Sequence, residues 1–214
     1  MTSIVTPFPD PGRVFTDQSW MERVLASIAV VELEDGTTFP VVIPFEPAVG
    51  RLGERTRDVH TVFASADRMG FRLLPNGTVD FLGDPEFFEL IHRAQRNQRS
   101  RSLTAFYEDQ YAGFHSARTS GVLPDGCIEE FDPDLAWLDQ DMIDDPAGDD
   151  GDDGDDLGFD VNAAVAATRE TMPNGTPFTK VLTVDPSALL PRSNGTFTVW
   201  WEPASSTVLV TRND

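Results

Sequence analysis

The chain has 214 residues, of which 40% are hydrophobic and 10% are aromatic, and this content excludes a wholly disordered protein. Its single cysteine excludes a disulfide framework and a cysteine-based zinc site. No apolar run approaches the roughly 18 residues of a membrane span, and no basic and then apolar leader opens the chain. We therefore expect a globular protein without a membrane anchor.

Negative charge is concentrated in one part of the chain. The formal net charge is −20, from 36 acidic and 16 basic residues. Residues 124–160 hold sixteen of the acids and no base, which leaves 20 acids against 16 bases, a net charge of −4, elsewhere. A salt-adapted protein would spread its acids over the whole surface, so the pattern indicates a local electrostatic function. This field repels nucleic acids and anionic membranes and attracts partners with a basic surface.

The first half of the chain has the pattern of an α+β domain. Prolines make residues 1–13 an extended N-terminal arm, and the α+β core is expected over 14–123. The alternative for residues 20–24 is the start of a short helix, for which Thr16 and Ser19 are both suitable N-caps. The β-rich runs 24–33 and 38–45 flank Asp35-Gly36 and predict a hairpin. Two prolines place the second of these strands at a sheet edge or at a bulge.

Further β-rich runs predict antiparallel hairpins in both halves of the chain. Asn76-Gly77 and Asn194-Gly195 are turn dipeptides of the kind that connects paired strands. The last 54 residues, 161–214, form a C-terminal β unit that is small to fold alone, and we expect it to complete the same domain. The additional strands are expected at 60–64, 70–74, 78–82, 178–184, 196–201 and 207–211.

The clearest helix pattern covers 84–98. Asp84 is a suitable N-cap, Pro85 suits the first helical position, and Phe87, Phe88 and Ile91 belong to an apolar face expected to pack on the sheet. A series of arginines occupies the end of this pattern and the residues just after it. It predicts a partner-binding patch, for phosphate or for the acidic segment, whereas the alternative is a solvated helix face. The arginines are Arg93, Arg96, Arg99 and Arg101.

The acidic region, 124–160, combines a short helix with an Asp/Gly-rich linker. The helix, 133–143, carries apolar side chains that fit a partner's groove or, alternatively, this protein's own core. The candidate partner-binding residues are Phe131, Leu135, Trp137, Leu138 and Met142.

The linker predicts a solvated acidic arm, with a Ca²⁺ loop as the alternative. In the best calcium frame, Asp149, Asp153 and Asp160 are the ligands. The frame is incomplete because Gly151 stands at a ligand position and Asp156 at the usual apolar one. We therefore expect no cofactor.

No catalytic motif is present in the sequence. The histidines His60, His92 and His115 are never within four residues of one another, and carboxylates near Cys127 are expected to raise the pKa of its thiol and suppress the thiolate. We expect a non-catalytic protein-interaction or assembly protein, of the phage or bacterial structural type, located in the cytoplasm or a virion. Its partner would be a protein with a basic surface, or a second copy.

Two other function classes stay open at this point. The first is an acidic inhibitor of a basic or nucleic-acid-binding protein, of the immunity or anti-restriction type. The second is an enzyme whose site is built from dispersed residues.

Overall fold

The computed structural model describes residues 3–49, 61, 63–65, 67–88, 98–130 and 177–213. These ranges form an α+β fold with two α-helices and two antiparallel sheets, as predicted. Of the strand expected at 60–64, residues 60 and 62 lie outside these ranges, and of the others only Ala64 belongs to a strand, β4 (Ala64–Ser65). The helices expected at 133–143 and beyond Phe88 fall outside the described ranges.

The first sheet has three strands in the order β1-β2-β3, and β2 and β3 form the hairpin predicted around Asp35-Gly36. Gly36 has a φ of +81°, a conformation that glycine adopts without strain, and the Asp35 carboxylate accepts a hydrogen bond from the Thr37 N–H at 2.8 Å. The proline-containing strand β3 lies at the sheet edge, as expected. The strands are β1 (Ser3–Pro7), β2 (Leu25–Glu32) and β3 (Thr38–Pro44).

The second sheet has seven strands, in the order β4-β5-β10-β9-β8-β7, with β6 also paired to β5. Because β10 pairs along β5, with Val208 opposite Phe71, the C-terminal strands complete a sheet that begins in the first half of the chain. The strands are β4 (Ala64–Ser65), β5 (Arg68–Leu73), β6 (Val79–Phe81), β7 (Ile128–Glu130), β8 (Thr179–Val184), β9 (Thr196–Glu202) and β10 (Thr207–Asn213).

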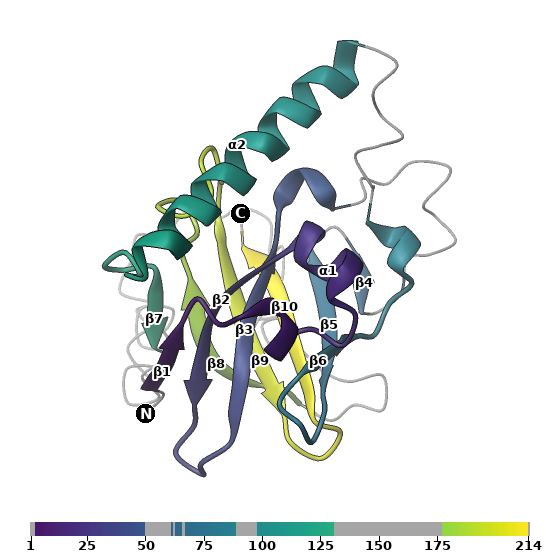
Figure 1. Ribbon diagram of the computed structural model, residues 1–214. Helices are drawn as coiled ribbons and strands as arrows, with labels where there is room; N and C mark the ends of the chain where they lie inside the picture. Colours follow the sequence, from purple (N-terminus) through teal and green to yellow (C-terminus); the bar gives the residue numbers. More distant parts are fainter. Residues whose placement is uncertain are drawn as a thin grey trace, which may run out of the picture.

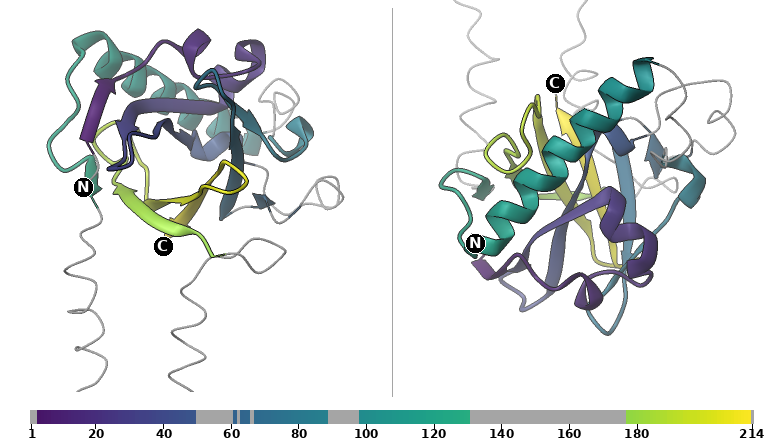
Figure 2. Two further views of the ribbon diagram at one scale, coloured as in Figure 1. Left: turned by 90° about the horizontal axis from the view of Figure 1, so that it is seen from below. Right: turned by 45° about the horizontal axis from the view of Figure 1, so that its top comes forward.

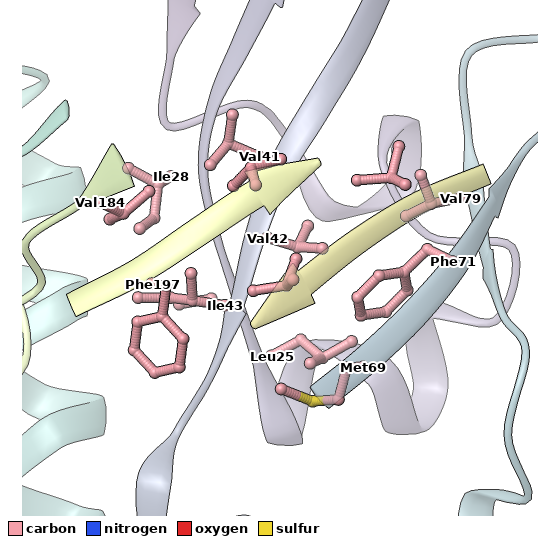
Figure 3. Close-up of a cluster of buried hydrophobic side chains, with 14 of the residues drawn as sticks. Leu25, Ile28, Val41, Val42, Ile43, Met69, Phe71, Val79, Val184 and Phe197 are labelled. Carbon is pink, nitrogen blue, oxygen red and sulfur yellow. The ribbon is translucent and has the colours of Figure 1, made fainter. Parts of the chain in front are cut away.

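The two sheets face each other, and the hydrophobic core fills the space between them (Figures 1 and 2). Figure 3 shows Ile28 and Ile43 of the first sheet among side chains of the second sheet, including Phe197 and Met69, and each of these four is at most 2% exposed. Phe39 of β3 stacks on Trp201 of β9 with ring centroids 5.6 Å apart. The core therefore joins residues that are far apart in the sequence.

The helix predicted over 84–98 does not form at its beginning. Asp84 caps as expected, accepting a hydrogen bond from the Glu86 N–H at 2.8 Å, but the cap begins only a 3-10 turn, η4 (Pro85–Phe87). Phe88 is already extended, with φ −78° and ψ 119°. This geometry lets two consecutive phenylalanines enter one aromatic cluster, whereas on a helix their side chains would diverge by about 100°. Tertiary packing thus overrides the helical pattern.

In the described residues, two α-helices accompany the sheets. The short helix α1 (Gln18–Val24) is capped by Asp17, whose carboxylate accepts from the Ser19 N–H at 3.1 Å, and not by Thr16 or Ser19. The long helix α2 (Gln98–Ser120) was not predicted. It crosses one end of the two sheets diagonally (Figure 1), with Phe114 packed against Phe45 at a centroid distance of 5.9 Å.

Replacing Phe88 with alanine should destabilise the protein by roughly 3–5 kcal/mol, the range for emptying a buried aromatic site. Phe88 is 2% exposed, and its ring centroid lies 5.1 Å from that of Phe81 and 5.7 Å from that of Trp20. The control is Glu86→Ala in the same turn, an exposed position where about ±0.5 kcal/mol is expected. Chemical denaturation measures both, and equal stability of the two variants would contradict this packing.

Candidate interaction surface

Most of the predicted site residues lie outside the described ranges. Arg99 lies in the first turn of α2, where only the backbone is described. The structure therefore leaves the predicted groove-binding helix, arginine patch and calcium frame untested. Within the ranges that the structure covers, no three His, Cys, Asp or Glu side chains are grouped as metal ligands. For Arg101, as for Arg99, only the backbone is described. The predicted site residues that lie outside the described ranges are Arg93, Arg96, Phe131, Leu135, Trp137, Leu138, Met142, Asp149, Asp153 and Asp160.

A polar cluster surrounds Glu46, in the 3-10 turn η2 (Glu46–Ala48). Its carboxylate accepts hydrogen bonds from the Ser193 hydroxyl and from the Asn194 N–H at 3.2 Å, and it pairs with an Arg212 guanidinium nitrogen at 3.5 Å. The Glu46 N–H donates to Oε1 of Gln110 at 3.0 Å. These contacts connect η2, α2, β10 and the turn before β9. Because the carboxylate is occupied in holding these elements together, we assign it a structural role.

Cys127 is a buried structural residue. It is 2% exposed, and burial raises the pKa of its thiol to about 12, with the nearby Asp185 carboxylate adding to the effect. The predicted suppression of the thiolate is therefore correct in direction. Its main cause is burial, with a carboxylate second.

His115 belongs to an aromatic row on α2. Its ring lies 4.2 Å from that of Tyr111, and one turn earlier the Tyr107 hydroxyl donates to the Arg23 carbonyl at 2.5 Å. Partial burial, followed by the charge of Arg118, lowers the pKa of His115, so its neutral form is favoured. This packing explains His115 without a catalytic role, and His60 and His92 lie outside the described residues.

Exposed aliphatic side chains occur in two segments of the described chain. In the described part of the chain, the large hydrophobic side chains that are exposed are Ile4 (47%), Val5 (51%) and Val122 (69%). Ile4 and Val5 belong to β1, and Val122 belongs to the segment that joins α2 to β7. β1 and β7 each end a sheet, and they lie side by side (Figures 1 and 2). We call Ile4, Val5, Val122 and strands β1 and β7 the β1–β7 edge.

Acidic side chains accompany this edge. Glu32 belongs to β2 next to β1, Asp125 follows Val122 along the chain, and Glu129 is on β7, and all three are exposed. The chain then continues from β7 into the rest of the acidic region. Apolar side chains with charged neighbours are the usual composition of a protein-binding surface, with the charges at its rim. The aliphatic pair at residues 4–5 is the signal in the sequence for this edge, and it is separate from the predicted partner-binding residues.

Comparison of the chain with protein-family models, curated proteins and solved structures finds no match. Neither α-helix in the described ranges combines the length and apolar character that crossing a bilayer requires.

The burial of Cys127 predicts a slow thiol reaction. At pH 8 the native protein should react with a thiol reagent at a small fraction of the rate seen in guanidinium chloride, because the native thiol is covered and protonated. Val122→Cys should add one thiol that reacts rapidly in the native state. Rapid reaction of native Cys127 would contradict the placement of the residue next to β7.

Proposed function

We propose that this chain is a non-catalytic interaction protein that binds a protein partner with a basic surface. The observation that carries the proposal is the segregation of charge, sixteen acids without a base in residues 124–160. This region begins next to β7, at an edge with exposed aliphatic side chains. Phosphates are repelled by such a segment, whereas lysines and arginines are attracted to it.

An assembly role, as a phage or bacterial structural component, is the form of this proposal that we favour. The arm at residues 3–7 forms β1, an outer strand of the first sheet, and its side chains Ile4 and Val5 are exposed for contact with another chain. Self-association is disfavoured because two copies would each carry a net charge of −20. A basic partner removes this repulsion.

The second candidate function is inhibition of a basic or nucleic-acid-binding protein. It is favoured by the same stretch, because carboxylates without intervening bases carry the same sign of charge as phosphates and bind the same lysines and arginines. The two functions differ in one consequence. An inhibitor competes with nucleic acid for its partner, whereas an assembly protein need not.

Replacing residues 149–156 with a neutral Gly/Ser linker of equal length tests the proposal. The swap removes six aspartates. At about 0.2–1 kcal/mol per exposed ion pair, binding to a lysine-rich peptide should weaken by about tenfold or more at low salt. The difference should shrink as salt rises, because screening already removes the same interaction. The melting temperature should stay unchanged or rise slightly, because the replaced stretch contains only aspartate and glycine and so has no apolar side chain to add to a core.

A variant in which the same eight residues are reordered is the matched control, since it keeps the charge and changes the spacing. It should bind the peptide as the native chain does. If the neutral swap unfolds the protein, or if calcium raises the melting temperature only in the native order, the segment is a structural cation site instead.

A further inference from the structure

We infer that the β1–β7 edge is the docking surface for a short aliphatic segment of the basic partner. In this arrangement the partner's aliphatic side chains contact Ile4, Val5 and Val122, and its flanking lysines or arginines face the acids around the edge. The inference rests on the proposed function for the charge of the partner. To the proposed function the inference adds where on this chain the partner binds, and that aliphatic side chains of the partner make the contact.

Strand β1 exposes aliphatic side chains to solvent. The register with β2 shifts between Ile4 and Thr6, which leaves Val5 without a Cα partner on β2. Such a bulge interrupts the alternation by which a strand turns every second side chain to the core. In addition, the four consecutive residues from Ile4 to Pro7 are all exposed, two of them large and aliphatic. A strand serving only to extend the sheet would turn one of these two inward.

Val122 is exposed on the segment that leads into β7, the strand next to β1 (Figures 1 and 2). Val122 comes two residues after the last residue of α2, and the segment continues to β7, next to β1 (Figures 1 and 2). The segment is held at both ends, by α2 and by the burial of Cys127. The aliphatic surface is therefore built from two ordered parts of the chain that are more than a hundred residues apart.

The acidic side chains of the edge limit the kind of partner that can bind there. A second copy would bring like charges together, with Glu32, Asp125 and Glu129 of each chain at the contact. Regular strand addition along β1 is opposed by the bulge and by Pro7, which has no N–H to donate. The occupant that fits is a different chain whose side chains, aliphatic with basic neighbours, make the contact.

Binding of three fluorescein-labelled peptides tests this inference. One alternates lysine with valine, the second alternates lysine with serine, and the third alternates glutamate with valine. The native chain should bind the Lys/Val peptide about tenfold more tightly than the Lys/Ser peptide, and should not bind the Glu/Val peptide. The Lys/Ser peptide measures the attraction of the acids alone.

The double variant Ile4→Ser/Val5→Ser should lose the preference for valine and bind both lysine peptides with the affinity of the native chain for Lys/Ser. Ala105→Ser, at an exposed position on α2, should keep the native preference. Both variants should unfold at the native temperature, because the changed side chains are exposed.

Three results would overturn the inference. Equal binding of the two lysine peptides by the native chain would show that charge acts without the edge, and would leave the proposed function standing. Binding of neither lysine peptide would reject the proposed function together with the inference. A native dimer that Ile4→Ser/Val5→Ser converts to a monomer, measured by light scattering, would show that the edge joins two copies of this chain.

Discussion

The position of α2 depends on a close approach at Gly113. A Cβ atom at this residue would lie 2.5 Å from Cδ of Pro191 and 3.0 Å from the Leu189 carbonyl oxygen, so only glycine lets the helix pack this closely on the turn before β9. One turn earlier, the fully buried Gln110 accepts the Glu46 N–H, and Glu46 in turn contacts β10. The helix is thus held by shape and by polar contacts. The segment that leads to β7 begins where α2 ends. The position of α2 therefore determines the position of this segment in the β1–β7 edge.

Local chemistry made the hairpins predictable, and remote packing made the helices hard to predict. Gly36, Gly77 and Gly195 each adopt a φ between +81° and +83°, which their turn dipeptides indicated in advance. In α2, serines, threonines and a glycine interrupt any aliphatic stripe, and the usable signal was the helical spacing of Tyr107 and Phe114. At Phe88 a helix was predicted that does not form. The helical pattern there is overridden by contacts with residues distant in the sequence, such as Trp20.

The features of the candidate site also differ in how far they can be predicted from the sequence. The charge of residues 124–160 is a property of composition, and its attraction for basic partners follows without knowledge of the fold. The exposure of Ile4 and Val5 depends on a register shift against β2 and on the neighbourhood of β7, both of which are tertiary facts. The concentration of acids was therefore readable from the sequence, whereas the exposure of Ile4 and Val5 was not, and the predicted partner-binding residues from Phe131 to Met142 lie outside the described residues.

Thermal unfolding of Gly113→Ala tests most directly whether α2 is held as described. Alanine is favoured over glycine inside a helix by about 1 kcal/mol, so an unconstrained α2 would be stabilised by the change. The close approach predicts the reverse, a loss of about 1–3 kcal/mol from overpacking against Pro191. Ser116→Ala, at an exposed position one turn later, should be neutral or slightly stabilising. A higher melting temperature for Gly113→Ala would show that the helix does not pack on this turn, and would remove the basis for the position of the β1–β7 edge.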